Sequence, residues 1–168
     1  QPGVIIQDLN DALLSHGLIY PPDPGSVTTA TFGGSVAESS GGLRGLKYGV
    51  TKDYVMGLEV VLADGSVFKC GGKTVKNVSG YDLPKLFCGS EGTLGIITSI
   101  TVRLIPSPEA RRSMLAVFDT LDGAARTITG IIGNKVIPAT MEIMDNVTIR
   151  AVEDYCHAGL PVNAAAVL

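Results

Sequence analysis

Tryptophan is absent from this 168-residue chain, and Phe and Tyr together make up only 5% of it. The 13 Lys and Arg residues form no basic block, and the 16 Asp and Glu residues leave a net charge of −3. Proteins that bind nucleic acid use basic surfaces, often with aromatic rings on which bases stack. The composition therefore argues against nucleic acid as a partner.

Long apolar runs and paired cysteines are also lacking. No apolar run reaches the roughly 18–20 residues that span a bilayer, so no transmembrane segment is expected. Cys70, Cys88 and Cys156 are an odd number without CxxC or Cys/His spacing, which argues against disulfides and structural zinc. We predict a reducing, cytoplasmic location, with peripheral attachment to the inner face of the membrane as the alternative. With 45% hydrophobic residues, the chain is expected to be globular.

Two common nucleotide-binding motifs are missing as well. Gly71-Gly72-Lys73-Thr74 resembles the end of a phosphate-binding P-loop, but Val67 stands where that motif requires its first glycine. We interpret this segment as a turn at the end of a strand. The dinucleotide motif GxGxxG is absent, so a Rossmann fold is not indicated.

What the chain has instead is glycine, 21 residues in all, much of it in two stretches. Tyr20–Gly49 holds the pairs Gly33-Gly34 and Gly41-Gly42 among Pro, Ser and Thr, and Cys88–Ile97 is the second stretch. Glycines let a ligand approach the main chain, and small hydroxyls and free amides suit a diphosphate or the edge of a heterocycle. We interpret the stretches as a ligand site, the alternative being a long surface loop. Within the first stretch we predict one short helical turn at Ala37–Ser40.

The rest of the first part predicts short elements. Apolar residues at helical spacing predict a helix, and Asp-Gly fits a hairpin turn between antiparallel strands. The predicted elements are a helix at Val4–Ser15, strands at Tyr54–Leu62 and Val67–Cys70, a helix at Tyr81–Phe87 capped by Asp82 with Leu83, Leu86 and Phe87 facing inward, and a strand at Ile96–Ile105.

The pattern changes near Pro108–Arg112, where we place a domain boundary. The elements predicted beyond it are a strand at Ser113–Phe118, a helix capped by Asp122 and ended by Gly133-Asn134, a strand at Pro138–Met144, a helix capped by Asp145 that runs to about Tyr155, and a strand at Ala164–Leu168. This β-α-β-α-β order predicts an α+β layer with helices on one face of a sheet.

Five segments in the same order resemble one known family: PPDPGS, TFGGSVAESSGG, KYGVTKDYVMGLEVVLADG, GGKTVKNVSGYDLPKLFCGSEGTLGII and TVRLIPSP. They resemble the FAD-linked oxidases and dehydrogenases with a vanillyl-alcohol-oxidase type FAD-binding domain, in the branch of glycolate oxidase FAD subunits and D-lactate dehydrogenases. The resemblance implies an α+β fold. Residues 1–110 would be the second subdomain of the FAD-binding domain, a mixed β-sheet with short helices, and residues 111–168 the start of an α+β substrate (cap) domain.

In that family FAD lies extended between two subdomains, so the resemblance also implies which residues contact it. Those near the flavin and diphosphate would be Pro22, Asp23, Gly25 and Ser26. Those that offer main-chain and hydroxyl contacts would be Thr31, Gly33, Gly34 and Ser35. Gly42 would lie near the isoalloxazine, and the adenosine half would meet Glu91, Gly92, Gly95 and Ile97. Arg44 remains open between a loop tether and a functional group.

The function implied by the resemblance is oxidation of a 2-hydroxy acid such as glycolate or D-lactate to the 2-oxo acid, with hydride passing to flavin N5. The alternatives are D-2-hydroxyglutarate or another D-2-hydroxy acid as substrate, or a non-catalytic module that binds a nucleotide or a partner. The family's HxGDGNxH-like segment is not found in these residues, so we expect no catalytic residue and no metal site among them. The resemblance also implies partner subunits of a glycolate-oxidase-like complex.

The chain opens on Gln1-Pro2-Gly3 and stops in the apolar run Ala164–Leu168, from which we expect a piece of a longer protein. The family's Gly-rich pyrophosphate loop would then lie upstream. We therefore expect this piece to bind FAD weakly or not at all and to turn over no 2-hydroxy acid. An incomplete second domain would leave sheet edges uncovered, which predicts self-association through residues 113–168.

Overall fold

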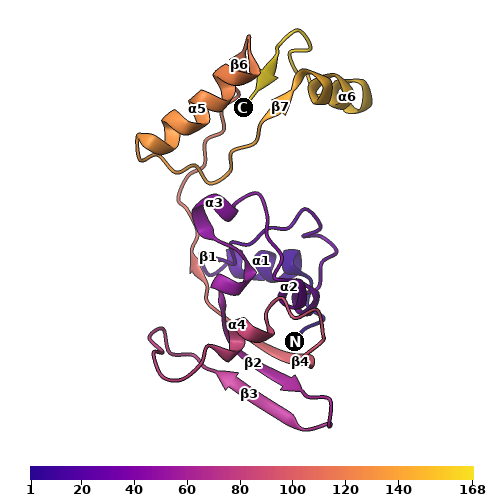
Figure 1. Cartoon of the computed structure of the whole chain (residues 1–168), viewed down its shortest axis with the longest axis vertical. Coiled ribbons are helices and arrows are strands. Elements are labelled where there is room, and N and C mark those ends of the chain that lie inside the picture. The colour runs from indigo at the N-terminus through magenta and orange to yellow at the C-terminus, as the bar shows by residue number, and fades with distance from the viewer. The chain divides into compact units, whose positions relative to one another are not determined.

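The computed structural model describes all residues 1–168 and divides the chain into two compact units, Gln1–Pro108 and Glu109–Leu168. Each unit combines short helices with small sheets (Figure 1), which confirms the predicted α+β class. The assignment of the units as part of an FAD-binding domain and the start of a substrate domain stays a prediction. The first unit contains α1 (Ile6–Leu14), β1 (Leu18–Ile19), α2 (Phe32–Glu38), α3 (Gly45–Tyr48), the 3-10 helix η1 (Thr51–Asp53), β2 (Val55–Val61), β3 (Val67–Gly71), α4 (Leu83–Phe87), β4 (Ile96–Val102) and β5 (Ile105–Pro106).

Strand β2 is the centre of a three-stranded sheet with the order β3-β2-β4. The predicted hairpin between β2 and β3 is confirmed, and Asp64 Oδ1 accepts a hydrogen bond from the Ser66 amide at 2.9 Å in its turn. Leu58 in β2 lies opposite Cys70 on one side and Ile100 on the other. All pairs in the unit are antiparallel, whereas a mixed sheet was expected. Periodicity marks a strand but carries no information about its direction across a long connection.

The predicted strand over Ile96–Ile105 is divided in two. Strand β4 ends at Val102, and β5 pairs with β1 in a separate two-stranded sheet. Between them the Arg103 amide donates to the carbonyl of Tyr54 at 2.8 Å. The alternation of side chains continues through this break, so the sequence pattern alone shows one strand.

The glycine-rich stretch Tyr20–Gly49 is not a continuous loop, because it contains α2 and α3. Helix α2 begins after Thr31, whose Oγ1 accepts a hydrogen bond from the Gly34 amide at 3.2 Å. The single turn predicted at Ala37–Ser40 is wrong, since the helix ends at Glu38. Burial of Phe32 and Val36 stabilises a helix that its two glycines disfavour, and that burial depends on tertiary packing.

The core of the first unit forms around Tyr20, which is fully buried. Its ring lies 4.7 Å from that of Phe32 and 5.8 Å from that of Tyr54, measured between centroids. Burial raises the pKa of Tyr20 to about 12. The Thr51 hydroxyl donates to the Ser40 carbonyl at 2.8 Å. The aromatic residues and this hydrogen bond hold the glycine-rich stretch against the start of β2.

The prediction for helix α4 is confirmed for its N-cap and is wrong for the orientation of one side chain. Asp82 is its N-cap, as predicted, and its side chain accepts a hydrogen bond from the Lys85 amide. Phe87 is buried, but Leu86 is 58% exposed, so its predicted inward orientation is wrong. A helix of five residues has only one face against the sheet, and Pro84 and Phe87 occupy it.

The second unit contains β6 (Val117–Phe118), α5 (Leu121–Gly133), β7 (Met144–Asp145), α6 (Asn146–Cys156) and β8 (Ala166–Val167). Its antiparallel sheet has the order β6-β8-β7. Asp145 caps α6 as predicted, whereas α5 is capped by Thr120 and Asp122 lies in its first turn. The strands predicted at Ser113–Phe118 and Pro138–Met144 shrink to two residues each, since most of their apolar side chains have no neighbouring strand.

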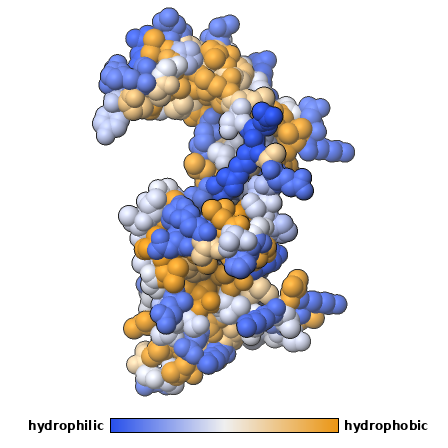
Figure 2. All heavy atoms as spheres, turned by 180° about the vertical axis from the view of Figure 1, so that it is seen from behind, coloured by the Kyte–Doolittle hydropathy of each residue, from blue (hydrophilic) through white to orange (hydrophobic).

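The surface of each unit mixes polar and apolar side chains (Figure 2). Several large apolar residues are almost fully exposed, among them Met114 and Tyr155 in the second unit. None of the helices has both the length and the apolar content that crossing a bilayer requires. The self-association expected from uncovered edges stays a prediction.

Candidate functional site

The two glycine-rich stretches meet in one pocket of the first unit, with a volume of about 410 Å³. We call it the glycine pocket. Its lining residues come from the N-terminus, from α2 and the residues just before it, and from the approach to β4 and its first residues. They are Pro2, Gly3, Thr31, Gly33, Gly34, Ala37, Gly92, Gly95, Ile96 and Ile97. Six of the thirteen residues that the family resemblance implies as cofactor contacts are therefore brought together.

Close backbone approaches build this pocket. A Cβ atom on Gly95 would lie 2.6 Å from Val60 Cγ1 and 2.8 Å from the carbonyl oxygen of Val61, so only glycine lets the chain enter β4 here. An isolated bridge between Ile5 and Thr31 draws the N-terminal residues to the start of α2. Figure 1 accordingly shows the N-terminus close to α2 and β4.

The amides at the start of α2 are already occupied within the chain. The amides of Phe32 and Gly33 donate to the carbonyls of Val4 and Pro2, both at 2.7 Å. The Gly34 amide donates to Thr31 Oγ1, and the Ser35 amide donates to the Thr31 carbonyl at 3.0 Å. The amides of Gly33, Gly34 and Ser35 are thus engaged within the chain, and the ligand contacts that the resemblance implies for these residues stay a prediction. This end of α2 is not a phosphate cradle.

What remains is a slot with small and aliphatic walls. Its lining holds no titratable side chain, and the Thr31 hydroxyl is its only side-chain polar group. A Cβ atom on Gly92 would meet nothing within 4 Å, so the slot is open beside this residue. Aliphatic walls with few polar groups suit a flat heterocycle such as adenine better than a charged diphosphate. The residues present therefore fit the adenine half of FAD.

Asp23, Gly42 and Arg44 form a second group, which is a structural tether. Asp23 Oδ2 lies 2.9 Å from Arg44 Nε, and Asp23 Oδ1 accepts a hydrogen bond from the Arg44 amide at 3.2 Å. A Cβ atom on Gly42 would lie within 2.7 Å of Asp23 Oδ1 and closer still to the Asp23 carbonyl, so Gly42 permits this contact. Of the two readings left open for Arg44, the structure favours the loop tether.

The other implied contacts lie outside the glycine pocket. Pro22 is fully buried and Ser35 is 4% exposed, so both belong to the core. Gly25, Ser26 and Glu91 are exposed in turns, with the Ser26 carbonyl accepting hydrogen bonds from the amides of Thr29 and Ala30. A direct ligand contact by the side chain of Pro22 or Ser35 would require the core to open.

Four lining residues were not predicted from the sequence: Pro2, Gly3, Ala37 and Ile96. Ala37 lies one helical turn after Gly33 and Gly34 and thus shares their face. A helix prediction over Phe32–Glu38 would have found it. Pro2 and Gly3 carry no local signal, because they reach the pocket through a bridge to a residue far along the chain.

Two family models match the chain. Residues 1–71 match a model described as FAD binding domain, and residues 107–168 match one described as FAD linked oxidases, C-terminal domain. The chain is 56% identical over 168 residues to the glycolate oxidase subunit GlcD of Bacillus subtilis, covering all of this chain and 36% of that protein. It is 44% identical over 168 residues to the GlcD protein of Escherichia coli K12, covering 34% of it.

A third relative carries a different name. The chain is 45% identical over 151 residues to a D-lactate dehydrogenase of Archaeoglobus fulgidus, covering 90% of this chain and 33% of that protein. The chain thus spans about a third of the length of these curated relatives.

A solved structure of alkyldihydroxyacetonephosphate synthase also matches. Its TM-score is 0.77 with 24% sequence identity, and the match covers 99% of this chain and 34% of the other. At this identity the likeness shows a shared fold.

Proposed function

The chain belongs to the FAD-linked oxidases, and on this premise we propose that the protein oxidises a small 2-hydroxy acid, such as glycolate or D-lactate, to the 2-oxo acid. When bound, FAD would supply the acceptor for the hydride that leaves the substrate carbon. The observation that carries the proposal is the glycine pocket, in which both glycine-rich stretches line one slot. The relatives named as glycolate oxidase and D-lactate dehydrogenase support the substrate class.

We assign the adenine half of FAD to the glycine pocket. Thr31 would offer its hydroxyl at the rim, Gly92 would leave room for the ring, and Ala37 and Ile97 would pack against its faces. These residues bind and orient the cofactor. None of them is proposed to transfer a proton, so the base and the groups that bind the substrate carboxylate are not assigned among them.

We further propose that the protein works as one subunit of a larger enzyme, since the relatives GlcD are named as subunits. Cys70, Cys88 and Cys156 are all unpaired, and burial raises the pKa of the Cys88 thiol, which keeps it protonated. Unpaired thiols fit the reducing cytoplasm, the location that we propose, with attachment to the inner face of the membrane as the alternative.

The cofactor site is tested by a substitution that fills the glycine pocket with a larger side chain. Ala37→Phe places a ring in the slot, and Ala12→Phe, at an exposed position of α1, is the matched control. NMR titration with AMP and with FAD should show chemical-shift changes at Thr31, Gly92 and Ile97 in the unaltered chain. Affinity should fall at least about tenfold in Ala37→Phe, about 1.4 kcal/mol, and stay unchanged in Ala12→Phe. If Ala37→Phe binds AMP and FAD as tightly as the unaltered chain, the adenine does not bind in the glycine pocket.

The test of the reaction uses the intact protein loaded with FAD and an electron-accepting dye. Oxidation of glycolate or D-lactate is the expected result. Turnover of D-2-hydroxyglutarate alone would replace the proposed substrate. Tight binding of FAD without turnover of any 2-hydroxy acid would favour a non-catalytic nucleotide-binding module.

A further inference from the structure

A second pocket of the first unit, of about 310 Å³, shares no lining residue with the glycine pocket. We call it the loop pocket, because residues 74–82 form much of its wall. The rest of its lining comes from the start of β2, the end of β3, the first residues of α4 and the residue after β4. It therefore lies at the other end of β4 from the glycine pocket, whose lining includes the first two residues of that strand.

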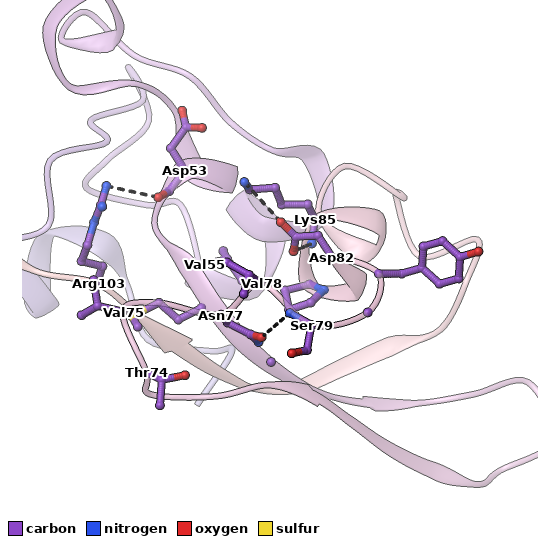
Figure 3. Close-up of a pocket in the computed structure, with 15 residues that line it drawn as sticks. Asp53, Val55, Thr74, Val75, Asn77, Val78, Ser79, Asp82, Lys85 and Arg103 are labelled. Carbon is purple, nitrogen blue, oxygen red and sulfur yellow. Dashed lines mark hydrogen bonds and ion pairs between the residues drawn. The ribbon is translucent and has the colours of Figure 1, made fainter.

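Four charged residues line the loop pocket, and each of them makes contacts within the chain. Asp82 Oδ2 and Lys85 Nζ form an ion pair at 3.2 Å. Asp53 Oδ2 accepts a hydrogen bond from the Val50 amide at 2.8 Å. Figure 3 shows Arg103 on one side of the pocket and the Asp82–Lys85 pair on the other, with Val55 and Val78 between them.

Arg103 and Asp53 are the charged lining residues without an ion-pair partner, and of these two only Arg103 is a cation. Its guanidinium carbon lies 5.0 Å from the centre of the Tyr54 ring, and its Nη2 donates to the Asp53 carbonyl at 3.4 Å. A guanidinium carries five N–H donors, so this contact leaves a fork free for an incoming carboxylate. The contact with the Tyr54 ring restricts the rotamers of the Arg103 side chain and so fixes the orientation of its guanidinium.

The remaining wall suits a small organic acid. Val55, Val75 and Val78 offer an apolar surface beside the guanidinium, and Asn77 and Ser79 offer an amide and a hydroxyl. The Ser79 amide donates to Asn77 Oδ1 at 3.4 Å, so this turn is internally held. The nearby carboxylates of Asp53 and Asp82 would repel a doubly charged anion more strongly than a singly charged one.

We propose that the loop pocket binds a small monocarboxylate, with the carboxylate on Arg103 and the short carbon chain on Val55 and Val78. Given the proposed function, the ligand class is the 2-hydroxy acid or its 2-oxo acid product, held at the end of the unit opposite the adenine slot. Arg103 then acts as a residue that recruits or retains the acid. The inference rests on the proposed function only for the identity of the acid.

The test measures binding alone, without flavin and without turnover. The purified chain is titrated with sodium D-lactate or sodium pyruvate, with sodium chloride as the ionic control and inorganic phosphate as the competing anion. NMR shifts of residues 74–82 and Arg103 should saturate with the carboxylates, and chloride should not reproduce them. Arg103→Ala should weaken binding about tenfold, and Arg103→Lys should recover only part of it.

Two further variants keep the outcome clear if Arg103→Ala disturbs the fold. Val78→Asp adds a negative charge at an exposed position of the pocket wall, where folding does not depend on the side chain, and should abolish carboxylate binding. Val147→Asp, at an equally open position of α6, should leave it unchanged. The proposal is overturned if both carboxylates bind equally well to the Val78→Asp variant, if phosphate binds more tightly than pyruvate, or if no carboxylate shifts these residues. Because AMP binding and turnover are measured separately, failure here leaves the proposed function standing.

Discussion

Replacement of Asp23 tests whether this residue is a structural tether, as its contacts indicate. Asp23→Ala removes the contact to Arg44 Nε at 2.9 Å and the hydrogen bond from the Arg44 amide at 3.2 Å. Both interactions join the start of the glycine-rich stretch to the segment before α3. The substitution should therefore lower the free energy of unfolding of the first unit.

The size of the effect follows from charge and exposure. A hydrogen bond to a charged group contributes about 1.5–3 kcal/mol. The side chains of Arg44 and Asp23 retain 27% and 17% of their exposure, so water can solvate the group that is left behind. We expect about 2 kcal/mol for Asp23→Ala and about 1 kcal/mol for Asp23→Asn, which keeps an acceptor for the Arg44 amide. The double-mutant cycle with Arg44→Ala should give a coupling energy of about 1 kcal/mol.

Urea unfolding followed by tyrosine fluorescence is the assay. The chain has five Tyr and no Trp, and all but Tyr155 lie in the first unit, so the signal reports mainly that unit. Asp8→Ala, at an exposed carboxylate in the first turn of α1, is the control and should stay within about 0.5 kcal/mol. A change for Asp23→Ala no larger than the control, or a coupling energy near zero, would refute the tether. Asp23 would then again be a candidate for contact with a ligand.

Three further predictions concern single contacts. Gly95→Ala should destabilise the first unit by about 1–3 kcal/mol in the same urea assay, because its Cβ would overlap β2. Thr120→Ala should cost about 1 kcal/mol in unfolding of the second unit and Asp122→Ala less, because Thr120 caps α5; circular dichroism during urea unfolding compares them, and equal losses would contradict the assignment. The amides of Leu160 and Gly159 bind the Glu153 carboxylate and lower its pKa, so its stabilising effect is present above the ordinary Glu pKa and is lost as pH falls below it. The melting temperatures of the unaltered chain and Glu153→Gln should thus differ at pH 7, and the difference should shrink as the pH falls below the ordinary Glu pKa of about 4.3.

Local patterns in the sequence sufficed for the elements whose causes are local. The hairpin turn at Asp64-Gly65 and the caps Asp82 and Asp145 each depend on atoms a few residues away, and all are confirmed. Five segments in a fixed order also indicated the family, because such segments keep their order whatever their detailed contacts. The sequence by itself thus determined the class of fold, the family and the two stretches that form the glycine pocket.

Only the tertiary structure decided which members of those stretches line the glycine pocket and which are engaged within the chain. The resemblance implied main-chain contacts from Gly33 and Gly34 to a ligand, and in the structure their amides donate hydrogen bonds within the chain, to the Pro2 carbonyl and to Thr31 Oγ1. Pro2 is far away in the sequence. The resemblance implied that Asp23 contacts the cofactor. In the structure its carboxylate binds Arg44, 21 positions later in the chain. A backbone amide or a carboxylate can form hydrogen bonds wherever it stands in a sequence. Whether a partner inside the chain or a ligand outside it satisfies that group depends on distances that only the folded chain sets.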